Sequence, residues 1–201
     1  MLPRRTQKTQ TMAFNRQVYR AVETLIEMMN DREQVDVRDK LAELTPDSIN
    51  SMLSTKNTII IDVPPSRIMF VLSSKFKLAD IKKQLEDEEF SYIALISKEK
   101  ITSINMRAIG ELKKNIQVFE LRELQFNITK HVLVPKNELI TDEEHISELI
   151  RLHNIKSRNQ FPIILKTDPV AKYLNAKTGN LVKITRWSPT SGEHIIYRCC
   201  I

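Results

Sequence analysis

The chain has 201 residues, of which 41% are hydrophobic and 28% charged, a composition typical of a protein that folds around an apolar core. No apolar run approaches the ~20 residues of a membrane span, and the basic N-terminus lacks the apolar segment of a secretory signal, so we expect an intracellular protein without membrane contact. The net charge is +6, but residues 21–126 are slightly acidic, which argues against autonomous tight binding to nucleic acid.

The N-terminal part of the chain has the pattern of helices. Residues 1–12 carry only basic charges, and we predict that they form a flexible tail. Apolar residues from Phe14 to Met29 then repeat at the period of a helix, which is expected over residues 13–30. A shorter helix is predicted near residues 37–44, and Thr45-Pro46-Asp47 predicts the start of a third helix that ends near Leu53.

The middle of the chain alternates between strand and helix patterns. Two β-branched runs on either side of Pro64-Pro65-Ser66 predict two strands joined by a tight turn. Strand patterns follow at residues 91–97 and 116–121, separated by helical patterns near residues 78–85 and 104–112. This alternation predicts a parallel or mixed sheet with helices packed on it. We therefore expect residues 13–126 to form an α/β domain.

The pattern changes after Glu123. Residues 124–140 are predicted to be extended, and Thr141 with Glu144 has the form of a capping box at the start of a helix. Asp168-Pro169 predicts the cap and first residue of a short helix that ends at Asn175. Two strands around a loop at residues 188–192 follow, with alternating apolar residues. Residues 127–201 are therefore expected to form a small α+β domain with a mixed sheet.

Residue types that commonly carry chemistry are not arranged as an active site. None of the four histidines pairs with another histidine or a cysteine at metal-ligand spacing. Cys199 and Cys200 are neighbours in a predicted strand, where they point to opposite faces as reduced core residues. Asp62 ends a strand, but the Glu-x-Lys sequence of a metal-dependent nuclease does not follow it. We expect no catalytic residue, metal, cofactor or small-molecule ligand.

Four segments after residue 127 carry a resemblance to a known family: "HVLVPKNEL", "DPVAKYL", "TGNLVKITR" and "SGEHIIYR". In this order they resemble the C-terminal domain of the fifth subunit of the eukaryotic nuclear RNA polymerases, a domain that has a counterpart in the archaeal RNA polymerase. The N-terminal half resembles the jaw domain of the eukaryotic subunit in length and element order. The resemblance implies a non-catalytic subunit of a multisubunit DNA-directed RNA polymerase.

The resemblance also implies partners and contact residues. Residues 127–201 would dock on the largest polymerase subunit and its neighbours, and the jaw would lie beside downstream duplex DNA with weak, sequence-independent contacts. A Thr-Pro-Ser-Ala loop approaches DNA in the family and is most similar here to residues 98–107, where Ser103 replaces the proline. Thr102 or Ser103 is equally expected to cap the next helix. The residues expected near DNA are Lys98, Lys100, Thr102, Ser103 and Arg107. The residues expected at the subunit interface are His131, Pro135, Asp168, Pro169, Tyr173, Lys183, Arg186, Tyr197 and Arg198.

Three departures from the family pattern favour a divergent lineage, with a large DNA virus as the suspected source: Asn137 for histidine, Asn175 for glycine and Pro189 for glutamate. A cellular protein would act in the nucleus, and a viral one in the virion or a cytoplasmic viral factory. Two alternatives remain open. An autonomous basic nucleic-acid-binding protein that shares the C-terminal module would bind duplex DNA in a salt-dependent way. A nuclease would need the missing Glu-x-Lys sequence.

Overall fold

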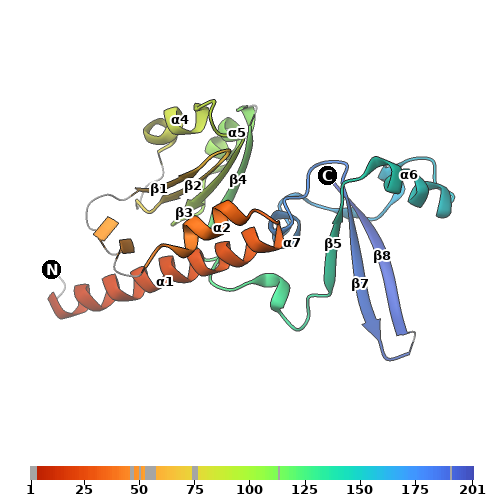
Figure 1. Ribbon diagram of the computed structural model, residues 1–201, viewed down its shortest axis with the longest axis horizontal. Coiled ribbons are helices and arrows are strands. Elements are labelled where there is room, and N and C mark those ends of the chain that lie inside the picture. The colour runs from red at the N-terminus through yellow and green to blue at the C-terminus, as the bar shows by residue number, and fades with distance from the viewer. Residues whose placement is uncertain are drawn as a thin grey trace. The chain divides into compact units, whose positions relative to one another are not determined.

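The computed structural model describes residues 4–45, 48–49, 51–52, 58–73, 77–112, 114–190 and 192–201. The chain separates into two units, unit 1 (Met1–Phe126) and unit 2 (Asn127–Ile201), and each is built around its own sheet (Figure 1). Among the described residues, no helix combines the length and the apolar character that a membrane crossing requires.

The central elements of unit 1 are, in chain order, β1 (Thr58–Val63), β2 (Ser66–Val71), α4 (Leu78–Glu86), β3 (Tyr92–Ser97), α5 (Ser103–Glu111) and β4 (Asn115–Glu120). They form a sheet with strand order β1-β2-β3-β4, in which the first two strands are antiparallel and the last three are parallel. Helices α4 and α5 make the crossovers that parallel strands require. The predicted mixed sheet with packed helices is confirmed.

Helices cover both faces of this sheet, so β2 and β3 are buried along their whole length. On one face, α4 and α5 pack on Met69, Ile93 and Leu95. On the other face lie α1 (Arg4–Asp31) and α2 (Val35–Ala42), and α1 buries Leu25 and Met29 (Figure 1). The continuous apolar strands thus result from a sheet between two helical layers.

Helix α1 is longer than the sequence pattern predicts. It begins at Arg4, so residues 4–12 belong to the helix and the prediction of a flexible tail is not met. The reason is local. No glycine or proline occurs between Arg4 and Thr45, and Gln, Lys and Arg are good helix formers, so the helical conformation extends from Phe14 back to Arg4. The third helix predicted from Thr45 to Leu53 lies largely outside the described residues.

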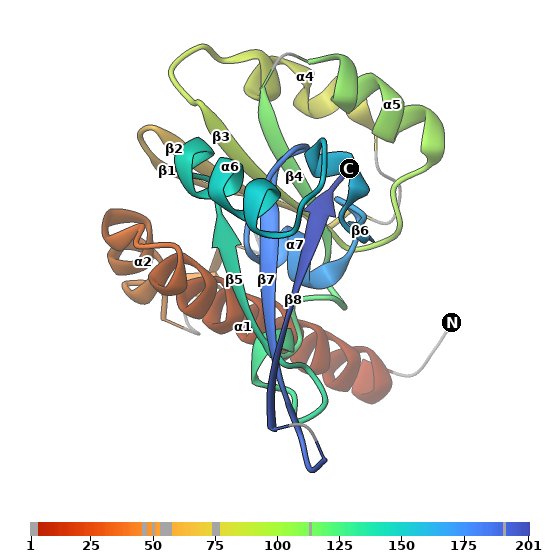
Figure 2. The ribbon, with the colours of Figure 1, turned by 90° about the vertical axis from the view of Figure 1, so that its right-hand side faces the viewer.

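The elements of unit 2 are the short 3₁₀ helices η1 (Ile128–Lys130) and η2 (Arg158–Gln160), strands β5 (Lys136–Ile140), β6 (Ile163–Ile164), β7 (Leu181–Ser188) and β8 (Gly192–Cys200), and helices α6 (Glu143–Leu152) and α7 (Pro169–Tyr173). The strand order is β5-β7-β8-β6 (Figure 2). β5, β7 and β8 are antiparallel neighbours, whereas β6 runs parallel to the end of β8. The mixed sheet predicted for this half is confirmed.

The sheet of unit 2 has a core on each face. Leu181 and Cys199 lie on one face and pack with residues of α6, including Leu149. Val182 and Cys200 lie on the other face and pack with Ala171 of α7. Both cysteines are free and buried, and burial raises the pKa of each thiol. The prediction of reduced core cysteines on opposite faces is confirmed.

Two local predictions in unit 2 are wrong. The extended pattern predicted for residues 124–140 is a strand only at β5, because Asn127 turns the chain into η1 by accepting a hydrogen bond from the Thr129 amide. The cap of α6 is Asp142 and not Thr141. The Asp142 carboxylate accepts from the amides of Glu144 and His145 at 3.3 and 3.2 Å, and its negative charge also suits a helix N-terminus.

Candidate interaction surfaces

The residues expected near DNA surround the start of α5. Thr102 is the cap of this helix, and its Oγ1 accepts a hydrogen bond from the Asn105 amide at 3.5 Å. Ser103 is the first helical residue, so the predicted capping role falls to Thr102. The first amides of a helix have no partner within the helix and can bind an anion when further groups assist them.

Three cations lie in the sequence around this helix start, and all are exposed. The Lys98 ammonium lies 4.7 Å from the centroid of the Phe14 ring of α1, so Lys98 already has a partner within unit 1. Lys100 and Arg107 form no ion pair with any residue that the structure describes. Arg107 is four residues after Ser103 and therefore lies on the same side of the helix. The Lys100 and Arg107 charges remain available to an external partner.

Lys183 and Tyr197, expected at the subunit interface, lie on the α6 face of the unit 2 sheet and are direct cross-strand neighbours. The Lys183 ammonium lies 3.3 Å from the Glu138 carboxylate on β5. Hydrogen bonds from Lys136 and Lys183 lower the pKa of Glu138. The Tyr197 ring is half-buried, with its centroid 5.6 Å from that of His153. Both predicted residues thus make contacts within unit 2.

Arg186 and Arg198 lie on the opposite, α7 face of the same sheet. Both are exposed, and neither is ion-paired with a described acidic residue. The Arg198 guanidinium donates to the Ile163 carbonyl at 3.3 Å, whereas Arg186 stands opposite His194. Since Lys183 and Tyr197 face the other way, the predicted interface residues do not form one patch.

The remaining predicted interface residues have local structural roles. His131 Nδ1 accepts from the Leu133 amide at 3.2 Å, and the half-buried Pro135 directly precedes β5. Asp168 caps α7 by accepting from the Val170 amide at 2.9 Å, and the exposed Pro169 is the first helical residue, as predicted.

Tyr173 differs from the other predicted interface residues because it is buried, with 5% of its surface exposed. Its hydroxyl accepts a hydrogen bond of 3.0 Å from the Asn127 side chain, which connects α7 to the residue before η1. Tyr173 is therefore part of the interior of unit 2. The sequence does not reveal this burial, and a contact of Tyr173 with a partner stays a prediction.

Several apolar side chains on unit 2 are exposed and were absent from the predicted interface. Val132 and Leu133 are 97% and 84% exposed in the loop after η1, and Trp187 near the end of β7 is 75% exposed. Val132 and Leu133 were not expected to be exposed together, because residues 124–140 were predicted to be extended and an extended segment directs half of its side chains to a core. Single exposed apolar residues are common, whereas an adjacent exposed aliphatic pair in one loop is a candidate contact surface.

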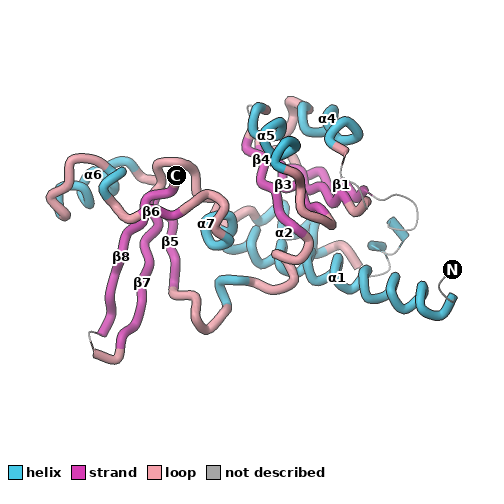
Figure 3. Tube along the Cα trace, turned by 180° about the vertical axis from the view of Figure 1, so that it is seen from behind, coloured by secondary structure: helices cyan, strands magenta, loops and turns pink. Residues whose placement is uncertain are grey.

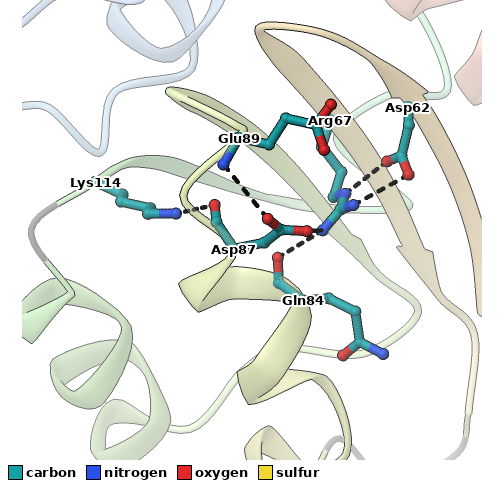
Figure 4. A network of polar contacts seen from close by, with 6 residues as sticks. All are labelled: Asp62, Arg67, Gln84, Asp87, Glu89 and Lys114. Atoms are coloured by element: carbon teal, nitrogen blue, oxygen red, sulfur yellow. Dashed lines mark hydrogen bonds and ion pairs between the residues drawn. The ribbon is translucent and has the colours of Figure 1, made fainter.

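Asp62, the acid considered for nuclease chemistry, is held by an arginine. Arg67 on β2 donates to both carboxylate oxygens of Asp62, to the Gln84 carbonyl at 2.9 Å, and pairs with Asp87 at 3.2 Å (Figure 4). Lys114 donates to the Asp87 carbonyl. Among the described residues, no group of three or more His, Cys, Asp or Glu side chains is placed to hold a metal ion. Asp62 therefore has a structural partner.

Comparison with known proteins extends the similarity over both units. The family described as "RNA polymerase Rpb5, C-terminal domain" matches residues 126–200. The subunit rpabc1 of DNA-directed RNA polymerases I, II and III from Dictyostelium discoideum is 31% identical over 187 residues, which cover 89% of this chain and 94% of the relative. The corresponding subunit from Caenorhabditis elegans is 29% identical, over 92% of this chain and 95% of the relative.

A plant relative matches a shorter segment. Subunit 5B of DNA-directed RNA polymerases IV and V from Arabidopsis thaliana is 30% identical over 115 residues, or 57% of this chain and 52% of the relative. The alignment with the Dictyostelium protein is longer than unit 2 and includes most of unit 1, so the relationship is not confined to a shared C-terminal module. The chain therefore belongs to the Rpb5 family, whose members are named as the RPABC1 subunit of DNA-directed RNA polymerases.

Proposed function

We propose that this chain is a non-catalytic subunit of a multisubunit DNA-directed RNA polymerase and acts in transcription with the other polymerase subunits. One observation carries the proposal: similarity to a shared polymerase subunit extends over 89% of this chain and 94% of the relative. The chain would act where the transcription machinery is, which is the nucleus of a cell. A viral source stays a prediction from sequence.

Unit 2 is the docking part of this proposal, and the largest polymerase subunit is its partner. The exposed apolar residues Val132, Leu133 and Trp187 support this assignment, because interface cores are rich in aliphatic and aromatic side chains that lose their water on binding. Unit 2 is also small, so it buries little of its own surface and gains stability from a partner.

Unit 1 lies beside downstream duplex DNA in this proposal. Support comes from the start of α5, where Lys100 and Arg107 are exposed without an ion pair among the described residues and Thr102 caps the helix. Contacts of this kind act on phosphates and carry no base information. They suit DNA that must move through the complex, because such binding is independent of sequence and weakens with salt.

Purification of the tagged full-length chain from cells that make it tests the docking assignment. Mass spectrometry should recover the largest polymerase subunit with the unchanged chain and with Ile104→Asp, which alters an equally exposed aliphatic residue of unit 1. Val132→Asp combined with Leu133→Asp should reduce recovery at least about tenfold, as expected for central apolar contacts. A chain that returns without polymerase subunits would contradict the proposed function.

The DNA assignment needs the assembled polymerase. Lys100→Glu combined with Arg107→Glu should reduce photo-crosslinking of the chain to downstream duplex. The slope of log affinity against log salt concentration should become shallower by about 0.9 for each lost phosphate contact. Glu88→Lys on unit 1 serves as a control that adds charge elsewhere. Tight, salt-dependent duplex binding by the isolated chain, without recovery of polymerase, would instead favour the autonomous nucleic-acid-binding protein.

A further inference from the structure

Strand β8 has one edge that is largely unpaired. Its inner edge pairs with β7 over the whole strand, from Gly192 to Cys199. Its outer edge pairs only with the two residues of β6, opposite Cys199 and Cys200. The part from Gly192 to Tyr197 has no strand beside it among the described residues, and the β7–β8 hairpin continues beyond the end of β5 (Figure 3). An exposed strand edge is a template for an added strand.

The direction of the backbone groups along β8 follows from two hydrogen bonds. The Cys199 amide points outward and donates to Pro162 at 2.8 Å, whereas the Cys200 amide points inward and donates to Asn180 at 2.9 Å. Because strand residues alternate, the amides and carbonyls of Glu193, Ile195 and Tyr197 also point outward. No described residue of the chain bonds to these outward groups.

The α6 face beside this edge has a groove and exposed apolar side chains. Ile195 and Tyr197 lie on this face, and an open groove of about 690 Å³ lies beside Tyr197 and α6. Leu149 and Leu152 of α6 line it together with the polar side chains of His145, Glu148 and Arg151. Leu152 is 77% exposed and Ile195 is 41% exposed. The cations on this face, Lys136, Lys183 and Arg151, lie among acids: Lys136 and Lys183 both pair with Glu138, and Glu148 lines the groove beside Arg151. A strand added here would direct apolar side chains to this face.

The opposite face of the same edge is basic. Arg186, His194 and Arg198 all lie on it and are exposed, and no described acidic side chain forms an ion pair with any of them. Side chains of an added strand alternate between the faces, so those on this side should be acidic. The charge difference between the two faces specifies the pattern of the partner.

We propose that the outer edge of β8, from Glu193 to Tyr197, accepts an extended segment of another polypeptide as an added strand, and that this segment alternates apolar and acidic residues. Backbone hydrogen bonds supply affinity and the two faces supply selectivity, as in other cases of strand addition. That the segment comes from another member of the polymerase rests on the function proposed above.

The binding test uses the full-length chain and a fluorescent peptide, acetyl-Glu-Val-Glu-Leu-Glu-Val-Glu-amide, with a peptide that carries lysine in place of each glutamate as its control. Fluorescence anisotropy should show saturable binding of the acidic peptide, and at least about tenfold weaker binding of the basic one. Equal binding of the two peptides, or absence of acidic-peptide binding, would overturn the proposal.

A matched pair of substitutions separates the backbone edge from the side chain. Ile195→Pro removes an outward amide and leaves the β7 ladder intact, which a strand tolerates only where that amide is unpaired. Ile195→Thr shortens the apolar side chain but keeps the amide. The proline variant should weaken acidic-peptide binding at least about tenfold more than the threonine variant does. Equal effects of the two would refute strand addition.

Two further readouts keep the proposal testable if the proline variant folds poorly. Arg186→Glu should weaken binding of the acidic peptide and strengthen binding of the basic one. A folding defect would not change the two in opposite directions. Amide exchange followed by NMR should slow at Ile195 and Tyr197 when the acidic peptide binds, because their amides become bonded. Unchanged exchange there, or a stable dimer of the chain that occupies the edge, would contradict the proposal.

Recovery of polymerase distinguishes this inference from the proposed function. If the unchanged chain and Ile195→Thr recover polymerase subunits and Ile195→Pro does not, both stand. If all three recover them equally, the strand-addition inference fails and the proposed function remains. If none recovers them while the peptide results hold, the proposed function fails and the edge binds a different partner.

Discussion

Arg67 is the residue whose replacement tests the packing of unit 1 most directly. Its side chain is 8% exposed, its guanidinium binds Asp62 and Asp87, and it lies 3.8 Å from the centroid of the Phe90 ring. A further hydrogen bond reaches the Gln84 carbonyl in α4 (Figure 4). Burial disfavours the charge on Arg67, but the bonds and attraction from Asp62 and Asp87 outweigh it and raise its pKa. One side chain thus connects the β1–β2 hairpin to α4.

Arg67→Met should destabilise unit 1. Removal of one partner from a buried ion pair costs about 3–5 kcal/mol, because the other charge stays buried. Here Asp62 and Asp87 are 44% and 39% exposed and regain water, which lowers the expected cost. The carbonyl of Gln84 loses a charged donor, and the contact with the Phe90 ring is weakened. We expect a net loss of about 2–4 kcal/mol in the free energy of unfolding.

Urea unfolding at pH 7, followed by circular dichroism, measures this loss, and hydrogen exchange of unit 2 peptides serves as an internal control. Arg67→Lys keeps the charge but not the fork that binds Asp62, so its loss should be smaller. The loss for Arg67→Met should persist in ~1 M NaCl, since salt screens a buried pair weakly. A loss below about 0.5 kcal/mol, the range of ordinary surface substitutions, would refute the reasoning.

Three further substitutions test unit 2, each by denaturant or thermal unfolding. Tyr173→Phe removes the hydroxyl that accepts from Asn127 and should cost about 1 kcal/mol. Asp142→Ala should cost about 1 kcal/mol by removing the cap of α6, whereas Thr141→Ala should cost less than about half as much. Glu138 has its pKa lowered by Lys136 and Lys183, so its contribution is present above about pH 4.5 and is lost as the pH falls through the lowered value. In Glu138→Gln the free energy of unfolding should fall less steeply below that pH. A decrease as steep as in the unchanged chain would contradict this.

Local signals in the sequence predict much of the fold because they act over a few residues. Asp168 followed by Pro169 can cap and start a helix in almost any context, and Asn175 adopts a φ of 54° that few other residues tolerate. Alternation in β7 and β8 likewise separates the two faces of the unit 2 sheet. These features need no knowledge of distant residues, and they are confirmed.

A prediction was wrong where two local signals compete, and contacts between residues distant in sequence could not be predicted. Thr141 and Asp142 are both suitable caps, and the structure has the second, whose carboxylate accepts two amides. Arg67 and Asp87 are twenty residues apart in sequence, so their pairing depends on how α4 returns to the sheet. The burial of Tyr173 likewise depends on a distant residue, because its hydroxyl bonds to Asn127, 46 residues earlier in the chain.

The free edge of β8 shows most clearly what topology adds to pattern. Nothing in "GEHIIYRCC" distinguishes an edge strand from a central one. The edge is free because its neighbour β6 is short, and β6 is short for reasons in its own segment. Pro162 has no amide to extend the ladder toward Tyr197, and the Phe161 ring turns onto the Tyr197 ring, 6.2 Å away between centroids, instead of continuing the strand. Two residues that precede β6 thus leave Glu193 to Tyr197 available to a partner.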